Sequence, residues 1–183
     1  MKRLIIQVSA FKAGSVPLMF LLVFALQGCN RGTDSKTGGA PATSPSPVSS
    51  SLDVVRVRTE AVSLPGGNID AKVLLSISPG FHINANPATF SYLIATEVTT
   101  GKVEGITVGA PNYPAAVKKK FQFAEQPLAV YEGEVPIKLN LRAEKNAAAG
   151  PRSLPLTLRV QACDEEKCYP PATLNSTISV TVK

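Results

Sequence analysis

Apolar and polar residues alternate with a period of two over much of residues 52–183. The alternating apolar residues are Val73, Leu75 and Ile77; Val135, Ile137, Leu139 and Leu141; Leu154, Leu156, Leu158 and Val160; and Ile178, Val180 and Val182. Such a period places apolar side chains on one face of a β-strand. Turn sequences such as Pro65–Asn68 and Pro79–Gly80 separate the segments. We therefore predict an all-β fold, an immunoglobulin-like antiparallel β-sandwich of about seven to nine short strands.

Two further segments are candidates for strands of this sandwich. Tyr92–Thr99 is rich in β-branched residues, and Val103–Val108 follows a glycine. β-branched residues are enriched in strands because they pack well on a pleated surface. We expect both segments to be extended.

The amino terminus has the features of an export signal. Basic residues precede the apolar run Val16–Leu26, which is shorter than the roughly 18 residues that a membrane-spanning helix needs. The run ends in Leu-Gln-Gly-Cys at Cys29, which resembles the lipobox of bacterial lipoproteins. We expect residues 1–28 to be a removable signal peptide and Cys29 to be lipidated. A plain signal peptide with an incidental Cys29 is the alternative.

Residues 29–51 are rich in proline, serine and glycine and contain almost nothing to bury. Such a composition predicts a disordered linker between the lipid and a folded domain at 52–183. The domain would face the periplasm from the inner or the outer membrane. Removal of the three cationic residues of the signal lowers the formal charge from +6 to +3. This modest charge gives no support for a nucleic-acid partner.

Lipidation of Cys29 would leave Cys163 and Cys168 as an even pair of cysteines in an oxidising compartment. Four residues separate them, and a tight turn could bring their Cα atoms within the roughly 4.4–6.8 Å that a disulfide needs. Closing so short a loop would contribute only about 2 kcal/mol to stability. The spacing leaves open whether such a bond is structural or reactive.

The strand that leads into the cysteines predicts which way Cys163 points. Leu154, Leu156, Leu158, Val160 and Ala162 share one parity and should face the core. Cys163 then faces away from the core, and we expect it to be accessible to a partner. The acidic residues at 164–166 disfavour a nearby thiolate, whereas Lys167 favours one.

Three segments resemble a known family, the N-terminal periplasmic domain of the thiol:disulfide interchange protein DsbD. The most specific is Cys163-x4-Cys168-Tyr-Pro-Pro, and the sequences at 79–86 and 130–133 also match. The resemblance covers roughly residues 52–183. It implies an immunoglobulin-like domain and no cofactor.

The resemblance also implies roles for individual residues. Cys163 and Cys168 are the redox pair, and the loop beside them is shaped by Tyr169, Pro170 and Pro171. The family covers its disulfide with a mobile loop that carries an aromatic residue. Here the candidate cap is the segment 120–125, with Phe123 as first choice and Phe121 as second.

The partners implied by the resemblance are a membrane-embedded thiol reductant, which supplies electrons, and periplasmic thioredoxin-like proteins, which receive them. No transmembrane domain and no Cys-x-x-Cys motif precede Lys183. We therefore expect a stand-alone lipoprotein, a component of a thiol:disulfide oxidoreductase system with a separate reductant. The alternative is a non-catalytic immunoglobulin-like binding module with a structural Cys163–Cys168 disulfide. The single histidine, His82, lacks metal-ligand partners at suitable spacing, so we expect a packing role and no metal site.

Overall fold

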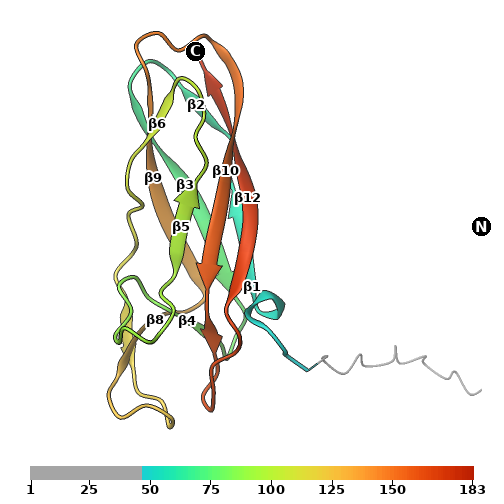
Figure 1. Ribbon diagram of the computed structural model, residues 1–183, viewed down its shortest axis with the longest axis vertical. Helices are drawn as coiled ribbons and strands as arrows, with labels where there is room; N and C mark the ends of the chain where they lie inside the picture. The colour runs from blue at the N-terminus through green and yellow to red at the C-terminus, as the bar shows by residue number, and fades with distance from the viewer. Residues whose placement is uncertain (1–46) are drawn as a thin grey trace, which may run out of the picture. The chain divides into compact units, whose positions relative to one another are not determined.

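The computed structural model describes residues 47–183 (Figure 1). The expected signal peptide, Cys29 and most of the expected linker lie outside the described residues. Residues 47–183 include one short 3-10 helix, η1 (Ser51–Asp53), and twelve strands joined by turns and loops. The strands are β1 (Val55–Thr59), β2 (Val62–Leu64), β3 (Asn68–Ile77), β4 (His82–Asn84), β5 (Glu97–Thr100), β6 (Ile106–Val108), β7 (Val117–Lys119), β8 (Leu128–Tyr131), β9 (Glu134–Ala143), β10 (Gly150–Val160), β11 (Ala162–Cys163) and β12 (Ala172–Val182). No helix in this part of the chain is both long enough and apolar enough to cross a membrane.

The strands form three sheets of four strands each. One has the order β1-β3-β9-β6, the second β2-β12-β10-β5, and the third β11-β4-β8-β7. Neighbouring strands in these sheets are antiparallel, apart from β2, which pairs parallel with the end of β12. Figure 1 shows the long strands of the first two sheets stacked as layers, with β4 and β8 of the third sheet at the lower end. The predicted immunoglobulin-like β-sandwich is confirmed, although residues 47–183 contain twelve strands and not the seven to nine expected.

The main core lies between the first two sheets. Strands β3 and β9 pair Val73 with Ile137, and β10 and β12 pair Leu154 with Ile178, and all four side chains are fully buried. Polar residues alternate with the buried ones along β9 and β10. The period of two therefore sets which face of each long strand is buried.

The turn at Pro79–Gly80 connects β3 of the first sheet to β4 of the third sheet. Phe81 N donates to Ser78 O across it at 3.1 Å, and Gly80 has a φ of 84°. A residue with a Cβ is disfavoured at such a positive φ, which explains the glycine. The predicted turn is confirmed, and it places β4 beside the cysteines.

The expected strand at Tyr92–Thr99 is largely a loop, because β5 begins only at Glu97. Side chains satisfy the backbone in the first part of this segment: Ile94 N donates to Gln161 Oε1 at 3.3 Å, and Ile94 O accepts from Asn84 Nδ2 at 3.1 Å. These bonds replace a strand ladder, so β-branched composition did not decide the conformation.

Candidate functional site

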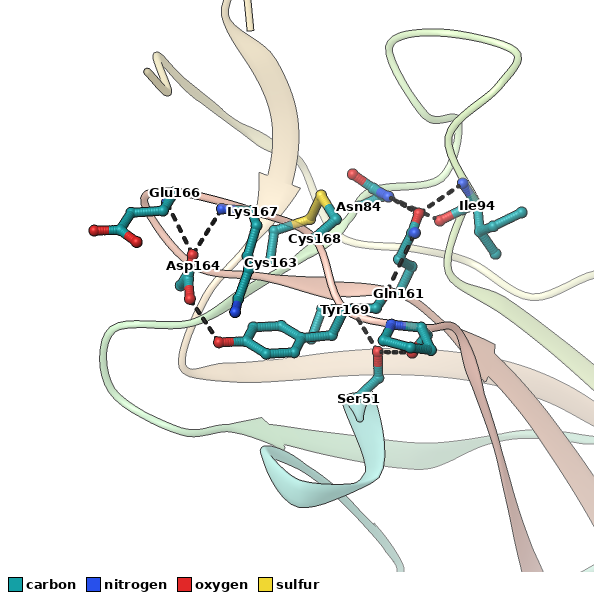
Figure 2. The surroundings of a disulfide bond; sticks show 12 residues. Ser51, Asn84, Ile94, Gln161, Cys163, Asp164, Glu166, Lys167, Cys168 and Tyr169 are labelled. Atoms are coloured by element: carbon teal, nitrogen blue, oxygen red, sulfur yellow. Dashed lines mark hydrogen bonds between the residues drawn. A yellow bond between two sulfur atoms is a disulfide. The ribbon is translucent and has the colours of Figure 1, made fainter. Parts of the chain in front are cut away.

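The two C-terminal cysteines form a disulfide in the loop between β10 and β12 (Figure 2). The S–S distance is 1.98 Å, the Cβ–S–S–Cβ dihedral is 93° and the Cα atoms are 3.9 Å apart. Cys163 lies on β11 and faces Cys168 directly in an antiparallel bridge. This direct pairing brings the Cα atoms closer than the range expected from the sequence.

Cys163 is only 1% exposed, so the prediction that it is accessible is wrong. Its parity is as expected, because Ala162 belongs to the main core cluster and Cys163 does not. However, β11 pairs with β4, and Cys163 lies opposite His82. His82 stacks on Phe121, which belongs to a second buried cluster with Leu128 and Val130. This second cluster covers the face that the sequence pattern left open.

Cys168 is partly exposed and lines a cavity of about 360 Å³. The apolar part of the lining consists of Tyr92, Leu93, Phe123, Ala124 and Leu128. Glu166 and Lys167 add charged groups. The two cysteines therefore differ: Cys168 borders a largely apolar cavity, whereas Cys163 is buried.

Asp164 organises the short loop between the cysteines. Its Oδ1 accepts from the backbone N–H groups of Glu166 and Lys167, both at 2.8 Å, and its Oδ2 accepts from Tyr169 Oη at 2.6 Å (Figure 2). Burial opposes ionisation, but these three bonds to the carboxylate outweigh it and lower the pKa of Asp164 below its usual value. The ionised side chain thus stabilises the loop conformation.

Tyr169, Pro170 and Pro171 form the exit of this loop. Tyr169 is 8% exposed, its ring lies 5.9 Å from that of Phe81, and Lys167 Nζ lies 5.3 Å from the centre of the Tyr169 ring. Pro170 and Pro171 are exposed. Tyr169 N also donates to Ala162 O at 2.8 Å, which closes the base of the loop.

Ser51 fixes the same exit from the amino-terminal side. Its Oγ donates to Pro170 O at 2.8 Å and accepts from Ala162 N at 2.9 Å (Figure 2). The residue is fully buried in η1, which is capped by Ser50. The sequence pattern placed Ser51 at the end of the expected linker and gave no sign of this role.

A second set of side-chain bonds connects the cysteine segment to the loop that carries Tyr92. Asn84 Nδ2 donates to Gln161 Oε1 at 3.2 Å, and Gln161 Nε2 donates to Tyr169 O at 3.4 Å (Figure 2). Gln161 Oε1 also accepts from Ile94 N. Asn84 is 1% exposed. The sequence pattern gave no sign of this network.

The segment expected to form a cap is the loop between β7 and β8, and it lies beside the disulfide. The ring of Phe123 is 41% exposed, lines the cavity with Cys168 and stacks on Phe121 with a centroid distance of 5.3 Å. Phe121 is 1% exposed. Lys119 Nζ pairs with Glu165 at 3.0 Å, which connects the base of this hairpin to the cysteine loop. Of the two candidates, Phe123 is therefore the one at the cavity, whereas Phe121 packs beneath it.

One family model matches most of this chain. The family model for the N-terminal part of the thiol:disulfide interchange protein DsbD matches residues 53–179. A comparison with curated protein sequences finds no significant match.

Two solved structures are among those similar to this chain. The DsbD N-terminal domain of Neisseria meningitidis in its reduced form is 22% identical, with a TM-score of 0.42 over 62% of this chain and 77% of that one. The N-terminal periplasmic domain of ScsB from Proteus mirabilis is 16% identical, with a TM-score of 0.41 over 68% of this chain and 44% of that one. Because the family model matches residues 53–179, which is more than half of the chain, the chain belongs to the family of DsbD N-terminal domains.

Proposed function

We propose that this domain carries out thiol–disulfide exchange through Cys163 and Cys168. It would take electrons from a membrane-embedded thiol reductant and pass them to periplasmic thioredoxin-like proteins. Family membership supports the exchange chemistry. The observation that carries the proposal is the asymmetry of the pair: Cys168 borders an apolar cavity, and Cys163 is buried beside it.

This asymmetry assigns an order to the sulfurs. In the reduced domain, the Cys168 thiolate attacks the disulfide of a partner, whose S–S bond breaks as a mixed disulfide forms and one partner sulfur leaves as a thiolate. Cys163 then attacks the Cys168 sulfur, which closes the domain disulfide and releases the second partner sulfur. Two electrons pass to the partner, and the two protons of the domain's thiols balance the two new partner thiols.

Phe123 is the proposed cap over the Cys168 side of the disulfide. It is held there by ring stacking on Phe121, and its hairpin by the exposed Lys119–Glu165 ion pair. Exposed ion pairs of this kind contribute about 1 kcal/mol or less. A docking partner could therefore displace the loop at low cost and reach Cys168.

We propose that residues 1–28 are removed, that Cys29 carries lipid, and that residues 29–51 connect it to the domain at 52–183. The domain would then work on the periplasmic side of the membrane. Mass analysis of the Cys29 peptide from membrane fractions, with a Cys29→Ser variant as control, tests this part independently of the redox chemistry.

A redox titration tests the exchange proposal. The full chain is equilibrated in graded thiol/disulfide buffers, and alkylation of the Cys163 and Cys168 peptides is followed by mass. A midpoint above about −300 mV supports exchange. A bond that stays oxidised below that potential indicates a structural disulfide and would support the alternative, a non-catalytic immunoglobulin-like binding module.

A trapping experiment tests the order of the sulfurs. The Cys163→Ser variant keeps Cys168 and lacks the resolving sulfur, so it should accumulate mixed disulfides with thioredoxin-like proteins of the cell envelope. Cys168→Ser is the matched control and should accumulate far fewer. Equal trapping by both variants would contradict the assigned order.

A further inference from the structure

His82, the single histidine of the chain, is a direct neighbour of Cys163. It begins β4 and is the register partner of Cys163 on β11. Residues directly opposite each other in an antiparallel pair share one face of the sheet, with Cβ atoms about 4.5–5.5 Å apart. His82 and Cys163 therefore lie side by side on one face of the sheet, and both are buried.

The imidazole of His82 is buried without hydrogen bonds. It is 1% exposed, and within residues 47–183 neither Nδ1 nor Nε2 has a hydrogen-bond partner. Its ring stacks on Phe121 with a centroid distance of 4.1 Å and an angle of 25° between the planes. An unpaired buried polar group destabilises a fold, so it usually marks a function or a missing partner. Among the described residues, no group of three or more metal-ligating side chains offers a metal as that partner.

The charged groups around His82 come from three neighbouring segments. Burial lowers the pKa of His82 and the nearby Lys119 cation lowers it further, whereas Glu132, Glu165 and Asp164 act in the opposite direction. The net effect is a pKa below the usual value, which leaves the imidazole neutral at neutral pH. A neutral imidazole has one nitrogen free to accept a proton.

The Cys163 sulfur needs such an acceptor when the disulfide is open. The thiolate, not the thiol, is the nucleophile in exchange. Burial and the acidic residues Asp164 and Glu165 both disfavour a charged sulfur at this position. Solvent has little access to Cys163. Its cross-strand neighbours are His82 and Cys168, and Cys168 is bonded to the partner when Cys163 attacks, so His82 is the neighbour that can accept the proton.

We propose that His82 accepts the proton of the Cys163 thiol when this sulfur resolves the mixed disulfide, an inference that rests on the exchange function proposed above. As the Cys163 sulfur attacks the Cys168 sulfur, its proton passes to the imidazole. The bond between Cys168 and the partner breaks, and the partner sulfur leaves with the electron pair. The imidazolium then returns the proton to this leaving thiolate, so His82 is neutral again when the domain disulfide is closed. In the opposite direction, the imidazolium protonates Cys163 as it leaves.

Two-step kinetics with a chromogenic disulfide test this role. The full chain carrying Cys29→Ser, so that only Cys163 and Cys168 remain, is reduced and mixed with dithiobis-nitrobenzoate in a stopped-flow instrument. Attack by Cys168 releases the first coloured thiolate, and resolution by Cys163 releases the second. At neutral pH, His82→Phe should slow the second phase about tenfold or more and leave the first within about twofold. Phenylalanine retains the stacking on Phe121, and folding is checked by circular dichroism.

A second variant separates proton transfer from hydrogen bonding. His82→Gln can hydrogen-bond but cannot take up a proton at neutral pH, so its second phase should be as slow as that of His82→Phe. A wild-type rate in either variant would overturn the inference. The pH dependence of the protein that retains His82 is an independent test. Between about pH 5 and about pH 9, the rate of the second phase should depend on an ionisation whose pKa lies below the usual histidine value of about 6.5. A single ionisation above about pH 8 would overturn the proposal even if neither variant folds.

The outcomes for the two proposals are distinguishable. If the reduced protein does not release the two coloured thiolates one after the other, the exchange function itself fails. It also fails if the disulfide cannot be reduced at all. If both phases occur and do not depend on His82, exchange stands and only the proton-transfer role is lost.

Discussion

The two ends of this domain are held together by different kinds of interaction. In the body of the sandwich, β3, β9, β10 and β12 are ten or eleven residues long and bury one apolar face. At the disulfide end, β4, β7, β8 and β11 have two to four residues each. There, the side chains of Ser51, Asn84, Gln161 and Asp164 bind backbone groups that a longer ladder would otherwise satisfy.

The packing differs in the same way. The main cluster extends through both large sheets, whereas the second cluster contains only Phe121, Leu128 and Val130 as buried members. Segments with few buried apolar contacts open at lower free energy than the core of a domain. We therefore expect the disulfide end to open at lower free energy than the body of the sandwich.

The largest expected effect lies in the body. Leu156 is 1% exposed in the centre of β10, and Leu156→Ala should lower the free energy of unfolding by about 2–5 kcal/mol. The redox midpoint of Cys163/Cys168 should not change, because the side chain lies far along the strand from the cysteines. Urea unfolding and redox titration check this pair of results. A shifted midpoint would show that the two ends are more tightly coupled than the packing indicates.

Ser51 is the position where the amino-terminal segment holds the disulfide end. Ser51→Ala leaves Ala162 N and Pro170 O without their hydroxyl partner and should cost about 1–3 kcal/mol of unfolding free energy. It should also increase hydrogen exchange at the Ala162 amide. Ser153 is exposed in β10, so Ser153→Ala is the matched control. Its free energy of unfolding should lie within about 0.5 kcal/mol of that of the parent. Unchanged exchange at Ala162 would mean that the loop does not depend on this clamp.

Phe123 tests whether the loop between β7 and β8 covers the Cys168 side of the disulfide. Phe123→Ala removes a partly exposed ring and should cost about 1 kcal/mol or less in stability. Reduction of the disulfide by a small thiol should become several-fold faster, because the cavity beside Cys168 opens. Val117→Ala is the control, since Val117 is 56% exposed on the same hairpin and does not line that cavity. Equal reduction rates for all three proteins would argue against a cap.

The smallest effect concerns Asp164 and depends on pH. The pKa of Asp164 is lowered in the folded state, so its contribution to stability is present above the ordinary value of 3.8 and is lost as the pH falls through the lower folded value. The difference in unfolding free energy between the parent and Asp164→Asn should therefore shrink below that pH. Denaturant titrations at several pH values measure it. A difference that is independent of pH would show that the ionised carboxylate is not what stabilises the loop.

The sequence allowed the body of the fold to be predicted well and the site only in part. The period of two identified β9, β10 and β12, because each has one face on the core and one in solvent. The same rule assigned Cys163 to the side away from the main core. It could not show that the β7–β8 hairpin, about forty residues earlier in the chain, folds over that side, because period-two alternation describes one strand at a time.

The amino-acid sequence by itself determined which residues alternate, where glycine and proline turns interrupt them, and that a cysteine pair five residues apart can close a loop. These are local properties of the chain. Only the tertiary structure decided that Cys163 is buried opposite His82, that Cys168 borders a cavity with Phe123, and that Ser51 holds the loop exit. Each of these contacts joins segments far apart in the sequence. Burial of a side chain depends on what packs over it, and no local pattern contains that information.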